Sequence, residues 1–526
     1  MRAIVFFFMT MVALPALADS TACNGGMVFV DGNGNGRQDA GESGLPGVRV
    51  SDGERLVVTG PDGDYRLATP SGRTAFLIKP AGFHAAKRVD GLADTWANVQ
   101  NQPGPALRYG GVPAASSACK DFALTRDAVS AASPLEVLVF GDPQPRSLVE
   151  VGYYERDIVA PLRGKRRARL GISLGDIVND DLSLYPALKA VDATLDIPWL
   201  HAPGNHDLDF DASSDEQSLG SFRHAFGPDT YAWEEDQANF IVLDDVIYQP
   251  GTKPAYVGGL REQQFAFLQA YLATAPKQRL LVLALHIPLF DSTSGVETFR
   301  RADRERLFAL LQPFPNVLVL SAHSHNQQHF FHGPATGWHG AKALHEYNVG
   351  AACGAYWAGM KDAQGIPVAT MSDGTPNGYA LLTINAGAAD LRWFAARASE
   401  DYQIALHAPK VLRRGAYPAF AVYANVFMGQ EDTVVEYRID EGEWRPMQRV
   451  LQADPALLAE NIRDDAAERL RSFDRSPEAS PSTHLWRGTL ATDLNNGTHS
   501  VAVRATIVGF GQAQAHTAYR LDEASP

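Results

Sequence analysis

Short apolar runs separated by turn residues fill the first quarter of the chain. The runs at 27–30, 48–51, 65–68 and 75–79 are four or five residues long, and Gly, Asp and Pro stand between them. Runs of this length between turn residues are typical of strands. We therefore predict an all-β domain over residues 19–128.

The pattern changes between about residues 135 and 390. Apolar runs alternate there with stretches such as 260–273 and 301–311, in which apolar residues recur at helical spacing. Strands that alternate with helices predict an α/β core. Strand-like runs return over residues 395–526, which we expect to form a β-rich domain with one helix at 457–473.

Composition and charge narrow the classes of function. The 526 residues are 45% hydrophobic and 20% charged, as expected for a globular protein of two or three domains. The net charge of −14 leaves no basic stripe that would bind a nucleic-acid polymer. A small phosphorylated substrate remains compatible with this charge, because bound metal ions reverse the local field.

The first 18 residues have the pattern of an export signal. Arg2 precedes an apolar stretch over residues 4–17, and Ala16-Leu17-Ala18 fits a cleavage site. The alternative is an N-terminal membrane anchor, for which the apolar stretch is short. We predict a signal peptide over residues 1–18 and a periplasmic or secreted mature protein without a membrane span.

The chain has three cysteines, Cys23, Cys119 and Cys353. An oxidising compartment permits a disulfide between Cys23 and Cys119, which would tie together the two ends of the first domain. Three free thiols are the alternative, because sequence alone does not determine connectivity.

A calcium-loop pattern lies near the start of the first domain. Its candidate ligands, with Gly36 at the turn between them, are Asp31, Asn33, Asn35, Arg37, Asp39 and Glu42. Strand-like residues flank the loop, so an EF-hand pair is not expected. The stretch resembles calcium-binding β-sandwich repeats of bacterial surface proteins, and residues 59–65 resemble the transthyretin-like sandwich. We expect a structural calcium ion, and a polar turn without an ion is the alternative.

Five strand-like runs in the α/β region each lead into residues of metal-binding type. In chain order these residues are Asp142 and Gln144, Asp176, Asn205 with His206 and Asp207, His286, and His323 with His325. In open α/β sheets the binding site lies beyond the carboxyl ends of the strands. The residues that follow the five runs should therefore lie close together. Together they predict a site for two metal ions, which a shared carboxylate, Asp176, would bridge.

Two pairs of these candidate ligands are two positions apart. Side chains at that spacing face the same way when the backbone is extended. Asp142 and Gln144 would then approach a metal ion together, and so would His323 and His325.

The order of the motifs resembles that of the calcineurin-like metallophosphoesterase superfamily, namely Asp-x-His, Gly-Asp, Gly-Asn-His-Asp/Glu, a lone His and Gly-His-x-His. The chain is similar in particular to a bacterial subgroup with Asp-Pro-Gln at the first motif and β-domains at both ends. The resemblance covers about residues 135–385. It implies a two-sheet αββα core between an N-terminal β-sandwich and a C-terminal β-rich domain.

The resemblance also implies a role for each residue. One metal ion would be held by Asp142, Gln144, Asp176 and His325. The other would be held by Asp176, Asn205, His286 and His323. His206 would donate a proton, and Asp207 would orient or tune His206. Gln144 stands where the family usually has His, which makes the first site oxygen-rich and favours a harder or weaker-bound ion such as manganese there. The expected cofactors are two divalent transition metals, with manganese, zinc and iron as the candidates.

The expected activity is hydrolysis of a phosphate ester by a metal-bridging hydroxide, with a phosphodiester as the favoured substrate. Arg146 is a candidate phosphate clamp, with a solvated loop arginine as the alternative. Two other functions stay open: a phosphomonoesterase, and a cell-envelope binding or scaffold protein with a vestigial core. The motifs determine neither the substrate nor the oligomeric state.

Overall fold

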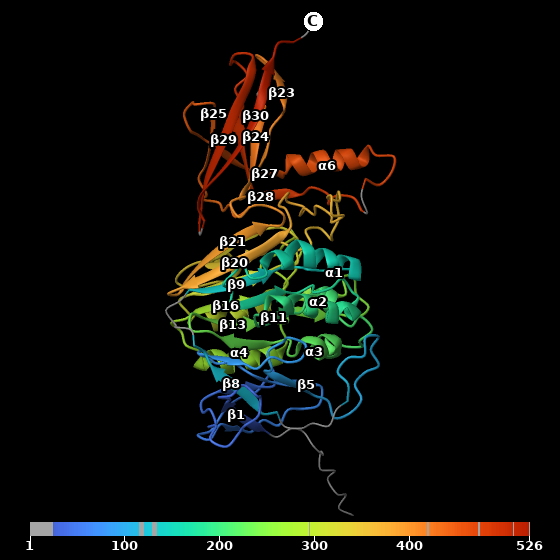
Figure 1. Cartoon of the computed structure of the whole chain (residues 1–526), viewed down its shortest axis with the longest axis vertical. Coiled ribbons are helices and arrows are strands. Elements are labelled where there is room, and N and C mark those ends of the chain that lie inside the picture. Colours follow the sequence, from blue (N-terminus) through green and yellow to red (C-terminus); the bar gives the residue numbers. More distant parts are fainter. Residues whose placement is uncertain are drawn as a thin grey trace, which may run out of the picture.

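The computed structural model describes residues 25–114, 120–128, 134–293, 295–417, 420–471, 474–508 and 510–524. Three parts follow one another along the long axis: a β-rich part, the α/β core, and a second β-rich part that ends at the C-terminus (Figure 1). The expected signal peptide, Cys23 and Cys119 lie outside the described residues, so both predictions stay untested.

The N-terminal part contains two four-stranded sheets. One consists of β1 (Gly26–Val30), β4 (Asp64–Tyr65), β6 (Phe83–Ala85) and β8 (Phe122–Arg126). The other consists of β2 (Arg49–Ser51), β3 (Leu56–Val58), β5 (Arg73–Leu77) and β7 (Trp96–Val99). Val28 and Phe122 from the first sheet and Val50 and Leu77 from the second share one buried apolar cluster. The two sheets therefore pack as a sandwich.

Two sheets also form the centre of the α/β core. The five-stranded sheet contains β9 (Leu135–Phe140), β10 (Leu170–Leu174), β11 (Trp199–Ala202), β20 (Gly378–Asn385) and β21 (Ala388–Ala395). The six-stranded sheet contains β12 (Tyr231–Glu234), β13 (Ala238–Val242), β16 (Leu280–Ala284), β17 (Val317–Ser321), β18 (Gln328–His332) and β19 (Leu344–Asn348). A small hairpin of β14 (Val246–Tyr248) and β15 (Tyr256–Gly258) lies apart from both.

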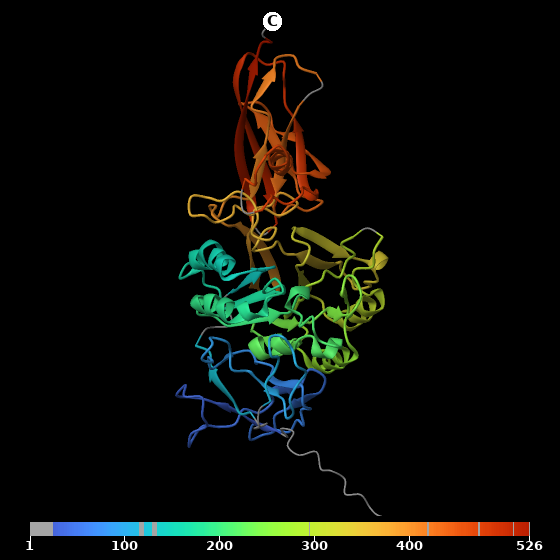
Figure 2. The same ribbon diagram turned by 90° about the vertical axis from the view of Figure 1, so that its right-hand side faces the viewer.

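Helices cover the outer sides of these sheets. The helices are α1 (Leu148–Tyr154), α2 (Tyr185–Asp192), α3 (Gly220–Phe226), α4 (Glu262–Thr274) and α5 (Arg301–Leu311). In Figure 2 the teal helices flank the core on one side and the yellow-green helices flank it on the other. This arrangement confirms the expected αββα core. Single helical turns at 155–159, 160–162, 182–184, 193–195, 205–207, 215–217 and 334–336 connect the larger elements.

Strand direction brings the predicted ligand segments to one edge of the core. Strands β9, β10 and β11 run parallel to one another. Strands β13, β16, β17 and β19 are likewise parallel. The central strands are mostly apolar and are buried, because both faces of the sheets are covered. Candidate ligands stand within two residues of the carboxyl ends of β9, β10, β16 and β17.

The C-terminal part again contains two sheets. One has β22 (Ile404–His407), β24 (Ala421–Val426), β27 (Gln448–Ala453) and β28 (Pro481–Thr489). The other has β23 (Val411–Arg413), β25 (Val435–Ile439), β26 (Arg445–Pro446), β29 (Gly497–Ile507) and β30 (Gly511–Asp522). This confirms the expected β-rich domain. None of the helices in the described part of the chain has the length and apolar content that a membrane crossing needs.

The helix expected at 457–473 is shorter than predicted. Helix α6 spans Pro455–Asp465, and the Asp454 side chain caps it by accepting hydrogen bonds from the backbone of its first turn. Beyond Asp465 the chain turns back along the helix, where Arg471 pairs with Asp464 at 3.0 Å and Ser476 N donates to Asp464 Oδ2. These contacts with α6 replace continued helical hydrogen bonds, so the prediction was wrong at that end.

Candidate metal centre

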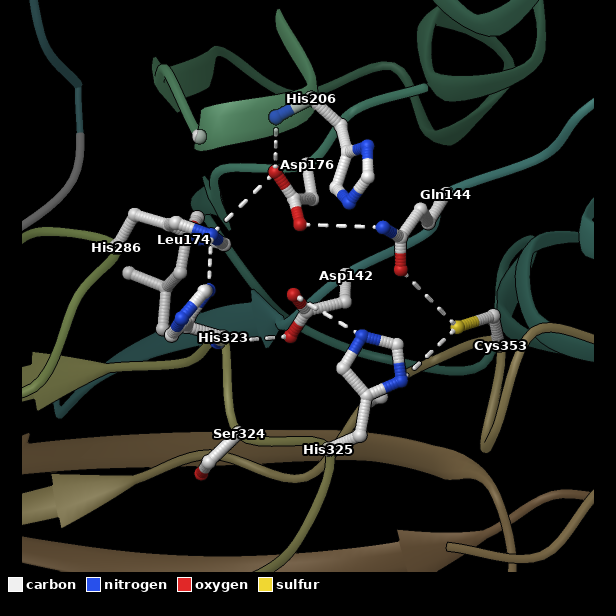
Figure 3. Close-up of polar contacts among 12 residues, drawn as sticks. Asp142, Gln144, Leu174, Asp176, His206, His286, His323, Ser324, His325 and Cys353 are labelled. Atoms are coloured by element: carbon white, nitrogen blue, oxygen red, sulfur yellow. Dashed lines mark hydrogen bonds and ion pairs between the residues drawn. The ribbon is translucent and has the colours of Figure 1, made fainter. Parts of the chain in front are cut away.

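The five strand ends meet at a single site (Figure 3). Two groups of side chains there have all their candidate ligand atoms within 4.8 Å of one another. Among the described residues these groups are Asp142 with Asp176 and His325, and Asp176 with His286 and His323. Asp176 belongs to both groups, as a carboxylate shared by two cations would.

The two predicted amide ligands adjoin these groups. Gln144 Nε2 donates to Asp176 Oδ2 at 3.2 Å, and Asn205 Oδ1 lies 3.1 Å from His286 Nε2. The amide nitrogen of Gln144 therefore faces the site, while its oxygen faces Cys353. A half-turn of the terminal amide exchanges the two atoms, which is how Gln144 would present oxygen to a cation.

Five of the predicted ligands have a left-handed backbone. Their φ angles are 42° at Asp142, 43° at Gln144, 48° at Asp176, 70° at His323 and 47° at His325. The expectation that each pair faces one way because its backbone is extended was therefore wrong. Residues other than glycine seldom adopt such angles, and they gather at functional sites, where the surrounding structure holds them in place.

Two glycines allow the ligand segments to come close together. A Cβ atom on Gly204 would lie 2.3 Å from Asp176 Oδ1, and one on Gly175 would lie 2.5 Å from His286 Nδ1. Both distances are far below van der Waals contact, so a side chain at either position would push the ligands apart.

The pKa values of His286 and His323 shift in opposite directions although the two residues are neighbours. His286 is fully buried, and its Nδ1 lies 2.8 Å from the carbonyl oxygen of Leu174, which leaves Nε2 directed at the site. Burial alone lowers the pKa of His286, but nearby carboxylates, chiefly Asp176, raise it to about 10. For His323, burial and the charge of His286 lower the pKa to about 3. The Asp176 carboxylate thus favours a positive charge beside it, which a bound cation would supply.

Asp142 indicates that a cation fits the other half of the site. Its side chain is fully buried, and its Oδ1 has no hydrogen-bond partner among the described residues. His325 Nε2 is 3.6 Å from that oxygen. Burial raises the pKa of the Asp142 carboxyl, because a buried carboxylate without a counter-charge is costly. A divalent cation would supply that charge, and the mixture of carboxylate, imidazole and amide donors suits a transition metal.

The predicted partner of His206 is not the one that the structure shows. His206 Nδ1 lies 2.7 Å from Asp180 Oδ1, and the His206 side chain is 26% exposed. The carboxylate of Asp207 instead accepts from Gly204 N at 2.8 Å and from the Tyr185 hydroxyl at 3.0 Å. The prediction that Asp207 orients the His206 ring was therefore wrong, because the Asp207 side chain is buried beneath the ligand loop.

Cys353 is a contact of the site that motif matching did not assign. Its Sγ is fully buried, 3.9 Å from Gln144 Oε1 and 3.8 Å from His325 Nδ1. Burial raises the pKa of this thiol well above its ordinary value, so it is neutral and packs beside the ligands. The sequence signal for this contact was its position in the Cys353-Gly354-Ala355-Tyr356-Trp357 stretch.

Arg146, the candidate phosphate clamp, lies at the rim of the site. Its guanidinium donates to Glu150 Oε1 and to the carbonyl oxygen of Tyr356 at 2.7 Å. The Tyr356 ring in turn lies over His325, with 4.7 Å between the ring centroids. Arg146 therefore positions Tyr356, and a role in binding phosphate stays a prediction.

The calcium-like loop connects two strand regions, as predicted, with β1 before it and β2 after it. Its candidate side chains converge within the loop. Asn33 Nδ2 and Asn35 Nδ2 both donate to Asp39 Oδ2, at 2.8 and 2.6 Å, and Arg37 N donates to Asn35 Oδ1. The Asp31 carboxylate accepts from the backbone of Gly34 and Gly36, and Glu42 accepts from that of Gly32 and Asp39. The bound calcium ion stays a prediction.

Comparison with known families gives three separate matches along the chain. Residues 135–327 match the calcineurin-like phosphoesterase model, residues 32–108 match the N terminal of calcineurin-like phosphoesterase, and residues 346–512 match the C terminal of calcineurin-like phosphoesterase. The chain belongs to the calcineurin-like phosphoesterases. The three matches cover both β-rich parts as well as the core, so the phosphoesterase resemblance and its accessory domains are confirmed.

Named relatives match a smaller part of the chain. A probable glycerophosphodiester phosphodiesterase of Arcobacter nitrofigilis is 26% identical over 165 residues, which are 30% of this chain and 56% of that protein. The 3',5'-cyclic adenosine monophosphate phosphodiesterase of Escherichia coli K12 is 27% identical over 158 residues, 30% of this chain and 54% of that protein. This chain thus spans just over half the length of the curated relatives it matches.

Two solved structures are also similar. A dimetal phosphatase from Danio rerio has 15% identity and a TM-score of 0.35, covering 50% of this chain and 98% of the other. A purple acid phosphatase from yellow lupin (Lupinus luteus) seeds has 14% identity and a TM-score of 0.36, covering 67% and 69%.

Proposed function

We propose that this calcineurin-like protein is an exported phosphodiesterase with two divalent metal ions. The observation that carries the proposal is the place of Asp176 in both ligand groups at the carboxyl ends of the core strands. The two named relatives, both phosphodiesterases by name, support a diester substrate. A small phosphorylated molecule, rather than a nucleic-acid polymer, suits a chain with a net charge of −14.

The residues divide into two ligand sets that share Asp176. Asp142, Gln144, Asp176 and His325 would hold one ion, and Asp176, Asn205, His286 and His323 would hold the other. Two bound cations would lower the pKa of a water molecule and neutralise charge on the phosphoryl group. Manganese, zinc and iron all suit these donors, and the Gln144 oxygen favours manganese in the first set.

His206 supplies the proton for the leaving oxygen. Burial alone lowers the pKa of His206, but the hydrogen bond with Asp180 and the charge of Asp176 raise it to about 9. The ring is therefore protonated at neutral pH, as a general acid must be. Asp180 holds Nδ1, which leaves Nε2 to face the leaving group.

Paired assays test this function. Wild-type protein with added manganese should hydrolyse bis(p-nitrophenyl) phosphate, and Asp176→Asn and His206→Ala should each lose at least about a hundredfold of kcat, as catalytic groups do. p-Nitrophenyl phosphate, tested in parallel, decides between a diesterase and a monoesterase. Equal rates in wild type and both variants would refute the assigned centre. Hydrolysis by none of them with any of the three metals would favour the scaffold alternative.

Export is the remaining part of the proposal. Its support is the basic start, apolar stretch and small-residue cleavage site of residues 1–18. Mass spectrometry of protein from the periplasmic fraction or the medium should show a mature chain that begins at Asp19. A chain in the cytoplasmic fraction with its first 18 residues intact would contradict export.

A further inference from the structure

A cleft of about 390 Å³ lies beside the metal centre, between the core and the C-terminal domain. The candidate ligand His325 lines it on the core side, together with Arg146 and Tyr356. The opposite wall is the segment 474–478, which follows α6 in the C-terminal domain. A substrate with its phosphoryl group at His325 would therefore extend its next groups along this segment.

The segment 474–478 is held firmly in place. Asn461, on α6, donates from Nδ2 to the carbonyl oxygen of Pro477 at 2.8 Å and accepts at Oδ1 from Ala479 N at 2.9 Å. Ser480 N donates to the carbonyl oxygen of Ser372 in the core at 2.8 Å. Figure 1 shows α6 extending from the C-terminal sheets over the side of the core that carries α1. The wall of the cleft is thus attached to both domains.

Buried contacts also connect the C-terminal domain to the ligand loop. Asp373 Oδ2 lies 3.1 Å from His484 Nε2 on β28, and both side chains are almost fully buried. The same oxygen accepts from Gln327 N at 2.8 Å, and Gln327 is two residues beyond the ligand His325. Interior contacts therefore connect the C-terminal domain to the loop that carries His325.

The side chains on the wall have the chemistry to bind a polar group. Arg475 is half exposed, and its guanidinium pairs with the exposed carboxylate of Asp465. An exposed ion pair contributes little to stability, so Arg475 can exchange Asp465 for a substrate group at little cost. Glu478 places acceptors on the same wall, and Ser372 adds a hydroxyl. Donors and acceptors together suit an alcohol with hydroxyl or zwitterionic groups better than an acyl chain.

We infer that the C-terminal domain forms part of the substrate site, where Arg475 and Glu478 bind the leaving alcohol of a phosphodiester, an alcohol that carries hydroxyl or zwitterionic groups. The inference rests on the proposed phosphodiesterase function. It makes Arg475 a specificity-determining residue, in a domain outside the catalytic core.

Equilibrium binding tests the inference without turnover. sn-Glycero-3-phosphocholine, a diester whose glycerol carries two free hydroxyl groups, is titrated into manganese-loaded His206→Ala protein by calorimetry. The double variant His206→Ala/Arg475→Ala should bind on the order of tenfold more weakly, because it lacks one charge-assisted hydrogen bond. Glu478→Gln should weaken it less, because the amide still accepts. Arg469→Ala is the matched control, since Arg469 is exposed nearby and does not line the cleft, and it should bind unchanged.

Steady-state kinetics of proteins that retain His206 provides a second test of the inference. The ratio of kcat/KM for glycerophosphocholine to that for bis(p-nitrophenyl) phosphate should fall about tenfold in Arg475→Ala and stay constant in Arg469→Ala. Unchanged binding in Arg475→Ala would overturn the inference, whether or not the enzyme hydrolyses either diester. Weakened binding without hydrolysis by the wild type would support the cleft assignment while refuting the proposed function.

Discussion

Asp176 combines the features that distinguish this site at the scale of single residues. Its backbone is left-handed, with φ at 48°, and its carboxylate lies 3.3 Å from the His286 imidazole. Its Oδ1 also accepts from His206 N at 2.8 Å. Backbone strain, charge and hydrogen bonds therefore meet on the one residue that both ligand groups share, as expected where function has determined the structure.

Asp180 should matter for catalysis through His206. Asp180→Asn should lower kcat by on the order of tenfold to a hundredfold with a smaller change in KM, because the neutral amide holds the imidazolium less firmly. Steady-state kinetics with bis(p-nitrophenyl) phosphate measures the effect. Asp181→Asn is the control, since the Asp181 side chain caps Ser183 instead of contacting His206. Equal kcat in the two variants would show that Asp180 does not position His206.

Asp192 should make stability depend on pH. It is buried, it accepts from the Tyr154 hydroxyl at 2.7 Å, and burial raises its pKa from 3.8 to about 7. The folded state therefore keeps the proton, so the stabilising contribution is complete below about pH 4 and is lost as the pH rises through 7. Asp192→Asn removes the ionisation and should gain stability relative to wild type between pH 4 and 8, by about 1–4 kcal/mol.

Urea unfolding at pH 5 and at pH 8 measures this difference. Asp196→Asn, at an exposed position nearby, should change stability little at both pH values. A constant difference between Asp192→Asn and wild type at the two pH values would show that Asp192 does not titrate as its burial indicates.

At the scale of elements, the sequence predicted most where hydrophobic patterns are local. The strands that lead to Asp142, Asp176 and His286 follow from their short, mostly apolar runs, which are typical of buried sheet strands. The end of α6 did not follow from its pattern, because the chain beyond Asp465 is held by side chains such as Arg471 that contact the helix itself. Such tertiary contacts override helix propensity.

The candidate site could likewise be predicted only in part from the sequence. Ligand types and their order could be predicted, since strand ends converge in any α/β sheet of this kind. The left-handed backbone at Gln144 and the pairing of His206 with Asp180 could not be predicted, because loops packed against other loops determine both. Cys353 lies more than two hundred residues from Gln144, and only the fold brings the two together.

The calcium-like loop provides a test at the same scale. Calcium should raise the melting temperature of the wild type relative to the protein in EGTA, because a ligand that binds only the folded loop stabilises it by mass action. Glu42→Gln should lose this increase, since a bidentate carboxylate at the last position contributes most to calcium binding. Glu54→Gln, in the same domain outside the loop, should keep it. Equal melting temperatures with and without calcium would favour the polar-turn alternative.

At the scale of the whole molecule, the core depends on both flanking domains. Lys79 of the N-terminal sandwich donates to Glu235 of the core at 2.7 Å in a buried contact. Asp373 of the core is paired with His484 of the C-terminal domain. The three parts therefore share interior charges as well as apolar surface, and we expect them to unfold with some cooperativity.

His484→Ala should destabilise the protein by about 3–5 kcal/mol, because it leaves the Asp373 carboxylate buried without its partner. Urea unfolding compares it with His516→Ala, which removes an exposed histidine from β30 and should have little effect. Asp373→Asn combined with His484→Ala should recover part of the loss. Equal stability of the two single variants would show that the interface does not depend on this pair.

Metal content tests the central claim most directly. After incubation with manganese and gel filtration, elemental analysis should find about two metal ions per wild-type chain and fewer than about one per Asp176→Asn chain, because both ions share that carboxylate. Asp181→Asn should retain two. A wild-type chain that binds no transition metal, or an Asp176→Asn chain that still binds two ions, would contradict the shared-carboxylate centre.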